Sequence, residues 1–382
     1  MIVIMTIFWV SFFAIAYIYA GFNILTALMG WIGNKSVVKQ NIFPSVDVII
    51  AAYNEENQIK SRVQNLLNLD YPQEKINIIV ASDGSTDATV KVVNSFTQTN
   101  IHCLDLPRQG KIFALNRAVK IATSDILVFT DANTTFHPLA LQKLVQNFAD
   151  PSVGGVCGNQ DYLQPQQSGN IKTGETIYWS FDKWMKSLQS GTGSIVSADG
   201  AIYAIKKSLF PKIKTSAVTD DFAISTAVIA KGYRLVYEPE ALAFEPANRQ
   251  DSADFKRKIR IINRGLASVA LRKELLNPFR YGYYAVILFS HKILRRLVPI
   301  FLILLFVTNM ILMNESWFYT ITATGQLAFY AFAFLGFSAN RKKIFYIPYY
   351  FVLSNTASLI ALWRVLSGKR IERWQPFRET ES

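Results

Sequence analysis

Three hydrophobic patterns follow one another along the chain and divide it into three regions. Residues 1–34 are almost wholly apolar and carry no charge, and the first cations, Lys35 and Lys39, come directly after them. Such a segment is long enough to cross a bilayer and too long for the core of a signal peptide. By the positive-inside rule, we expect a membrane helix with its N-terminus outside and the following domain in the cytoplasm.

Residues 35–280 change to short β-branched runs that alternate with helical stretches. Three runs end in turn or acidic residues: 45–52, 76–81 and 126–130. The helical stretches between and after them include 59–69, 88–96 and 111–122. Strand–helix–strand order with right-handed crossovers predicts an α/β domain on a mostly parallel, Rossmann-like sheet.

Residues 281–382 turn apolar again. Two segments, about 297–314 and 317–340, are free of charge and long enough to span, whereas 281–296 mixes aromatics with cations as an interfacial helix does. Residues 344–363 are also uncharged but are interrupted by polar residues and Pro348. The charge rule keeps the basic tail after them inside, so we favour an interfacial or re-entrant helix over a fourth span.

Composition narrows the class of partner. The net charge is +13, but Lys and Arg crowd beside the apolar segments, which indicates anionic membrane lipids and no nucleic acid. The two cysteines, Cys103 and Cys157, lie in apolar runs and are expected to be buried hydrophobic residues. The three histidines have no ligand spacing, which argues against a zinc site.

Acidic residues gather where the predicted parallel strands end. The segments concerned are Tyr53-Asn54-Glu55-Glu56, Asp83-Gly84-Ser85-Thr86-Asp87 and Asp131-Ala132-Asn133. Ligands of open α/β sheets bind outside the carboxyl ends of the strands. Carboxylates there suit a divalent cation that bridges to a diphosphate, so the pattern indicates a nucleotide-sugar enzyme working at a membrane.

Together with Thr219-Asp220-Asp221, these segments resemble, in order and spacing, the inverting glycosyltransferases of family 2. The resemblance is strongest to the membrane-bound group that contains cellulose, hyaluronan and poly-N-acetylglucosamine synthases. It implies a GT-A-like cytoplasmic domain with N- and C-terminal transmembrane helices in the cell membrane. The implied reaction is metal-dependent transfer of a hexose or N-acetylhexosamine from a UDP-sugar to a growing polysaccharide, with export or synthase subunits as further partners.

The resemblance assigns the nucleotide to two strand ends. Tyr53 and Glu55 correspond to the corner that lies against the base and ribose, and Asp83 resembles the aspartate that hydrogen-bonds uracil. A purely structural alternative stays open, because acidic residues also favour a helix N-terminus. Ser85 and Asp87 can likewise be explained as caps of the next helix.

The diphosphate and metal are assigned to the next two segments. Arg108-Gln109-Gly110-Lys111 precedes a helix and suits a diphosphate through Lys111, although a solvated loop would show the same pattern. Asp131-Ala132-Asn133 occupies the family's Asp-x-Asp position, so Asp131 and Asn133 are the expected ligands of Mg²⁺ or Mn²⁺. Asn133 replaces an aspartate and brings no charge, which leaves the metal preference open.

Catalysis and acceptor binding are assigned to later residues. Asp221 matches the family's general base, although Thr219 or Asp220 could simply cap the helix that follows. The resemblance assigns Asp220 to the binding of the acceptor. Asp199 and Gly200, within Ser197-Ala198-Asp199-Gly200-Ala201, resemble the acceptor loop, where Asp199 either binds a sugar or closes a turn.

The largest departure from the family lies in its Gln-x-x-Arg-Trp motif. Arg260 falls in register with the motif arginine and is a candidate diphosphate contact, but Ile261 replaces the tryptophan. The stretch can also be a basic amphipathic helix that faces the membrane. Processive synthesis therefore stays open, beside single addition to a lipid-linked acceptor and a non-catalytic membrane scaffold.

Overall fold

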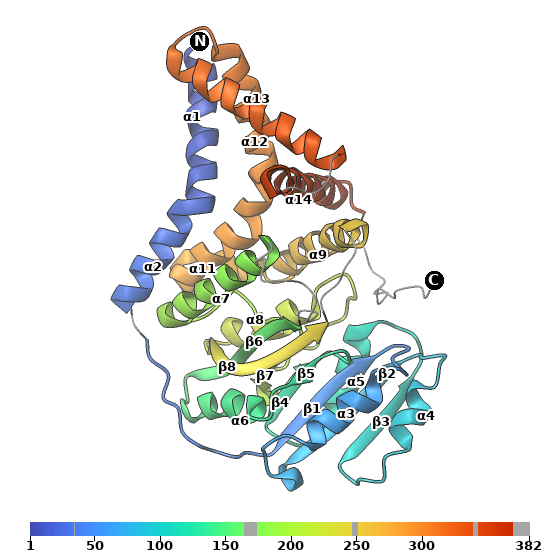
Figure 1. Cartoon of the computed structure of the whole chain (residues 1–382). Helices are drawn as coiled ribbons and strands as arrows, with labels where there is room; N and C mark the ends of the chain where they lie inside the picture. Colours follow the sequence, from blue (N-terminus) through green and yellow to red (C-terminus); the bar gives the residue numbers. More distant parts are fainter. Residues whose placement is uncertain (34, 164–173, 247–250, 339–342, 370–382) are drawn as a thin grey trace. The chain divides into compact units, whose positions relative to one another are not determined.

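The computed structural model describes residues 1–33, 35–163, 174–246, 251–338 and 343–369 (Figure 1). These residues form two units. Within the described ranges, residues 29–246 and 270–285 make up what we call the sheet unit. Residues 1–28, 251–269 and 286–369 make up the membrane unit.

The sheet unit is built on one eight-stranded sheet. Its strands are β1 (Val46–Ala52), β2 (Ile76–Asp83), β3 (Ile101–Leu106), β4 (Ile126–Thr130), β5 (Thr135–Phe136), β6 (Val153–Leu163), β7 (Tyr203–Lys206) and β8 (Arg234–Pro246). They lie in the order β3-β2-β1-β4-β7-β6-β8-β5 (Figure 1). The pairs β2–β3, β1–β2, β1–β4 and β6–β8 are parallel, and the other three are antiparallel. The predicted parallel set of β1, β2 and β4 is confirmed.

Seven helices belong wholly to the sheet unit: α3 (Ile59–Leu67), α4 (Thr89–Asn94), α5 (Lys111–Ile121), α6 (Ala140–Val145), α7 (Gly174–Thr192), α8 (Asp220–Ala230) and α10 (Pro278–Tyr281). The three helices expected from periodicity correspond to α3, α4 and α5. The strands β3, β5, β6, β7 and β8 were not predicted from the sequence.

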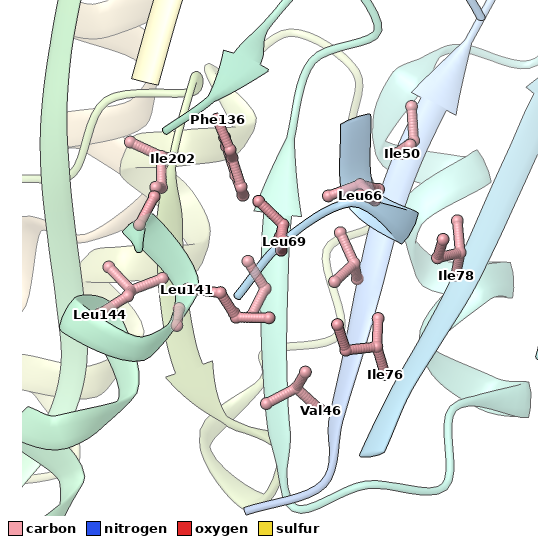
Figure 2. Packing of buried hydrophobic residues seen from close by; sticks show 14 of the residues in the cluster. Val46, Ile50, Leu66, Leu69, Ile76, Ile78, Phe136, Leu141, Leu144 and Ile202 are labelled. Atoms are coloured by element: carbon pink, nitrogen blue, oxygen red, sulfur yellow. The ribbon is translucent and has the colours of Figure 1, made fainter. Parts of the chain in front are cut away.

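The core explains why all residues of β1 except Asp47 are apolar. Every residue of β1 is buried. Its even-numbered residues join a cluster with α3 and α6, of which Figure 2 labels Ile50, Leu66, Leu141 and Leu144. Helix α5 packs against β1 and β2. A parallel sheet covered in this way needs continuous apolar strands, and the carboxyl ends of these strands are therefore held at fixed positions.

The membrane unit contains most of the long apolar helices. Its helices, some of which extend into the sheet unit, are α1 (Ile2–Ala16), α2 (Phe22–Gly33), α9 (Asp251–Leu271), α11 (Tyr283–Leu288), α12 (Arg295–Leu312), α13 (Trp317–Ser338) and α14 (Lys343–Leu366). Four helical stretches of the described chain are long and apolar enough to cross a membrane: Ile2–Gly33, Tyr283–Leu312, Trp317–Phe337 and Ile344–Leu366.

Contacts inside the membrane unit join its helices in pairs. Phe8 of α1 packs with Leu312 and Tyr319, and the Asn309 amide nitrogen of α12 donates to Gln326 of α13 at 2.7 Å. Because hydrocarbon offers no competing partner, such polar pairs hold membrane helices together. The interfacial placement of 281–296 and of 344–363 stays a prediction, and the basic tail beyond residue 369 lies outside the described residues.

Candidate active site

The predicted site residues meet at one edge of the sheet. Tyr53 follows β1, Asp83 ends β2 and Asp131 follows β4. These three strands are parallel neighbours, so their carboxyl ends lie along the same edge. The sequence prediction that the acidic segments share one site is supported by this register.

The first two segments are locked together by side-chain hydrogen bonds. Asn54 has a φ of 55°, its backbone N–H donates to Ser85 Oγ at 3.0 Å, and its Oδ1 accepts from the Thr86 N–H at 2.6 Å. Glu56 Oε2 accepts from the Ala88 N–H just before α4 at 2.8 Å. The structural role left open for the acidic residues therefore applies to Glu56, which stabilises the start of α4.

Asp83 organises the loop that precedes α5. Its carboxylate is 2% exposed and accepts hydrogen bonds from the Gln109 and Gly110 backbone N–H groups at 2.8 and 2.9 Å. Arg108 Nη1 donates to the other oxygen at 2.8 Å, and its guanidinium lies 3.3 Å from the centroid of the Tyr53 ring. The Gly110 N–H also lies 3.0 Å from that second oxygen. These four contacts match the roughly four acceptor positions of a carboxylate, so a base contact by Asp83 would replace one of them.

Gly84 makes this close packing possible. Its φ is +70°, and a Cβ there would lie 2.7 Å from the backbone nitrogen of Arg108. Any other residue would push the loop away from Asp83. The glycine therefore brings the β2 end and the basic loop into contact.

Lys111 joins Asp131, the predicted metal ligand, to the segment that carries the predicted base. Its Nζ lies 2.6 Å from Asp131 Oδ1 and 2.9 Å from Asp220 Oδ2. Burial alone would lower the pKa of Lys111, but Asp131 and Asp220 outweigh it and raise that pKa above the usual lysine value. The ammonium is therefore charged, and the side chain of Lys111 is only 11% exposed, so the solvated-loop alternative does not describe it.

The predicted acceptor loop lies against the same carboxylate. A Cβ at Gly200 would lie 3.4 Å from Asp131 Oδ2. Thr130 Oγ1, one residue before Asp131, donates to the Ala201 carbonyl at 2.7 Å. The structure thus brings Asp199 and Gly200 next to the end of β4.

Asp221 lies in the first turn of α8, after Thr219. The Thr219 side chain makes no capping hydrogen bond, and Asp220 is bound to Lys111, so the simple capping explanation does not account for this segment. Asp221 is partly exposed, and its Oδ1 accepts from the Phe222 N–H at 2.7 Å. Its exposure leaves the carboxylate accessible to a ligand.

Arg62 was missed from the sequence. It is 2% exposed on α3, donates to Thr130 Oγ1 at 3.0 Å, and lies 4.1 Å from the Phe136 ring centroid. Burial lowers the pKa of Arg62 to about 9, while Asp131 opposes the shift. The guanidinium therefore remains a positive charge behind the Asp131 end of β4. Its signal in the sequence was a cation on the apolar face formed by Ile59, Val63 and Leu66.

The donor set suits a metal that takes most of its ligands from a substrate. No cluster of three or more acidic, histidine or cysteine side chains able to hold an ion occurs within the described residues. Asp131 is one-third exposed, and Asn133 is exposed beside it. Mg²⁺ is commonly bound by one or two carboxylates together with phosphate oxygens, and these two residues fit that pattern.

One buried hydroxyl near these carboxylates has no partner. Tyr203 Oη on β7 makes no hydrogen bond within the described structure. Burial first, and then Asp220, Asp221 and Asp131, raise the pKa of Tyr203 above its ordinary value. The hydroxyl therefore stays protonated, and a donor is available close to the anionic cluster.

Comparison with known families shows what the domain is similar to. The model of the family described as "Glycosyl transferase family 2" matches residues 47–213. Residues 47–213 are thus similar to family 2 glycosyltransferase domains. The match includes β1, β2, β4 and the acceptor loop, and it ends before Asp221.

Two curated relatives share the name poly-β-1,6-N-acetyl-D-glucosamine synthase. The one from Staphylococcus aureus is 30% identical over 220 residues, which cover 56% of this chain and 52% of the relative. The one from Staphylococcus epidermidis is 30% identical over 206 residues, covering 52% of this chain and 49% of that protein. The chain thus spans about half the length of the curated relatives it matches.

A solved structure supports the fold assignment. A mannosyltransferase from Pyrobaculum calidifontis, in complex with GDP-Man and Mn²⁺, aligns with a TM-score of 0.72 and 21% identity. The alignment covers 95% of this chain and 100% of that one. The predicted GT-A-like fold with apolar helices at both ends is confirmed.

Arg260 belongs to α9 in the membrane unit, and its predicted contact with the diphosphate stays a prediction. Burial first, and then the like charges of Arg264 and Arg257, lower the pKa of Arg260. Ile259 and Ile262 of the same helix pack on Ala357 and Ala361 of α14. The helix is therefore amphipathic, as the alternative interpretation of this stretch expected.

We expect Asp83→Ala to weaken UDP binding by at least about tenfold. The change removes charge-assisted hydrogen bonds, each worth roughly 1.5–3 kcal/mol, that hold the Arg108–Lys111 loop. Titration calorimetry of the full chain measures the affinity, with Asp105→Ala on the neighbouring strand β3 as the control. Equal UDP affinities for the wild type and Asp83→Ala would contradict the assignment.

Proposed function

We propose that this chain is a membrane-bound, inverting glycosyltransferase. It moves a hexose or N-acetylhexosamine from a UDP-sugar to a growing polysaccharide. The family 2 domain supports the reaction class, and the relatives named poly-β-1,6-N-acetyl-D-glucosamine synthase make N-acetylglucosamine the first sugar to test.

The observation that carries this proposal is the shared position of Lys111. Its ammonium lies within 3 Å of Asp131, which is predicted to hold the metal and the donor diphosphate. The same ammonium lies within 3 Å of Asp220, the neighbour of the predicted base Asp221. A donor diphosphate bound at Lys111 would therefore lie close to the start of α8. The two ion pairs of Lys111 therefore support a donor site and an acceptor site that lie next to each other.

In the proposed reaction Asp221 acts as the general base. Its carboxylate takes the proton of an acceptor hydroxyl while that oxygen forms a bond to the anomeric carbon of the donor. The bond between this carbon and the diphosphate oxygen breaks, and the nucleoside diphosphate leaves with both electrons. Attack from the face opposite the leaving group inverts the anomeric centre.

Protein cations stabilise the departing diphosphate in this account. Lys111 is already charged and fixed by two ion pairs, so little reorganisation is needed when negative charge develops. Asp131 and Asn133 would hold Mg²⁺ or Mn²⁺ together with diphosphate oxygens. When bound, the ion supplies neutralisation of the leaving group's charge.

The membrane location follows from the four candidate spans and the first charges after them. Ile2–Gly33 is followed by Lys35 and Lys39, which supports a catalytic domain on the cytoplasmic side of the cell membrane. The acceptor would then be a glycan or a lipid-linked sugar. Ile261, in place of the tryptophan, favours single addition to a lipid-linked acceptor as the second candidate function.

A donor panel tests the proposal. The purified chain is incubated with UDP-sugars, with GDP-mannose as a comparison, in the presence of Mn²⁺, Mg²⁺ or EDTA, and the product is sized. We expect UDP to be released from a UDP-sugar in the presence of the metal ion, and we expect this release to stop in EDTA. A long product supports polysaccharide synthesis, and a single added sugar supports transfer to a lipid-linked acceptor. If no nucleotide is released with any donor and acceptor, the proposed function fails and the non-catalytic membrane scaffold is the remaining alternative.

Asp221→Asn should reduce transfer by at least about 10²-fold, the lower end for loss of a general base. Its affinity for UDP should stay within about twofold of the wild type, because the base is assigned to the acceptor hydroxyl. Asp70→Asn, an exposed carboxylate after α3, is the matched control. Wild-type turnover by Asp221→Asn would show that another group removes the proton.

A further inference from the structure

A second buried ammonium supports the acceptor loop. Lys186 on α7 exposes 8% of its side chain and forms ion pairs with Asp182, at 2.8 Å, and with Asp199. Asp182 lies one helical turn before Lys186, whereas Asp199 belongs to the loop Ser197–Ala201. The lysine therefore connects a rigid helix to the one carboxylate of the acceptor loop.

The electrostatic balance keeps this ammonium charged. Burial alone would lower the pKa of Lys186, but Asp199 and Asp182 outweigh burial and raise it well above the ordinary value. Because one cation lies between two carboxylates, the group of Lys186, Asp182 and Asp199 carries a net negative charge. Without the ammonium between them, the two partly exposed carboxylates would repel each other, so we expect the position of Asp199 to depend on Lys186.

The rest of the loop is fixed by other groups. The Ala198 N–H donates to Ser225 Oγ at 3.1 Å, and the Ala201 carbonyl accepts from Thr130. The Asp199 N–H points to the sulfur of buried Cys157 at 3.4 Å. The backbone is thus held by β4, β6 and α8, and Lys186 is left to orient the Asp199 side chain.

The location of Asp199 makes its orientation matter for the reaction. Its neighbour Gly200 lies against Asp131, and the Asp199 side chain remains 26% exposed while one of its oxygens binds Lys186. An exposed carboxylate with a free acceptor position next to the donor site suits a sugar hydroxyl. A carboxylate used only to close a turn would not need a cation brought from another element.

We propose that Lys186 is a positioning residue that holds Asp199 to accept a hydrogen bond from a hydroxyl group of the acceptor sugar. The proposal rests on the glycosyltransferase function proposed above. Lys186 itself touches neither donor nor acceptor. Its loss should therefore weaken acceptor binding while leaving the nucleotide site, formed by β1, β2 and the Arg108–Lys111 loop, intact.

The test compares four full-length chains: wild type, Lys186→Met, Lys186→Arg and Lys183→Met. Lys186→Met keeps the length of the side chain and removes its charge, and Lys186→Arg restores a cation. Lys183→Met is the matched control, because Lys183 lies on the same helix and pairs with the more exposed Asp161 at 3.1 Å. The probes are UDP, and a β-1,6-linked N-acetylglucosamine pentasaccharide titrated in the presence of UDP.

We expect Lys186→Met to weaken pentasaccharide affinity by at least tenfold and to keep UDP affinity within twofold. In turnover, the KM for the pentasaccharide should rise by a similar factor, with the KM for the donor unchanged. Lys186→Arg should recover most of the affinity, and Lys183→Met should match the wild type. If Lys186→Met does not fold, Asp182→Asn is the second variant, because it keeps the ion pair between Lys186 and Asp199. Asp182→Asn should retain the pentasaccharide affinity of the wild type.

Binding and turnover separate the two proposals. If the wild type binds the pentasaccharide but transfers no sugar, the proposed function fails and the affinities still report on Lys186. Equal pentasaccharide affinities for the wild type and Lys186→Met, or a loss of Lys186→Met affinity that Lys186→Arg does not recover, would overturn the positioning role.

Discussion

The ammonium of Lys111 lies 2.6 Å from Asp131 and 2.9 Å from Asp220, and the two carboxylates could not be packed together there without a cation between them. The end of β4 and the first turn of α8 therefore depend on one side chain that begins α5. Breaking a buried ion pair on one side commonly costs about 3–5 kcal/mol, because the remaining charge is left uncompensated. These ion pairs hold the end of β4 and the first turn of α8 together without substrate.

Buried cations recur behind the acidic edge of the sheet. Arg62 reaches Thr130 from α3, Lys111 reaches Asp131 from α5, and Lys186 reaches Asp199 from α7. Each helix contributes one cation to a different point around the same strand end. Because the helices are packed on the sheet, these charges are held before any ligand binds, which is the condition for electrostatic stabilisation of a transition state.

The parts of the fold that the sequence predicted are those with simple patterns. The strands β1, β2 and β4 are short runs of mostly apolar, often β-branched residues, and their shared direction brought Asp83, Asp131 and Tyr53 to one edge. The long parallel pair β6–β8 was missed because glycines interrupt β6. Those glycines are needed for close packing, since a Cβ at Gly155 would lie 2.8 Å from Leu235 and one at Gly158 would lie 2.7 Å from the Ala241 carbonyl. Arg62 and Lys186 were missed because long cationic side chains are normally on the surface, and their partners come from distant segments.

The anomeric configuration of the first transferred sugar tests the central claim most directly. With an α-linked UDP-sugar as donor, one in-line displacement assisted by a single aspartate must give a β-linked product, which the proton NMR coupling of the anomeric hydrogen reports. We predict a β-linkage. An α-linked product would contradict the account, because retention requires either two displacements or attack from the face of the leaving group.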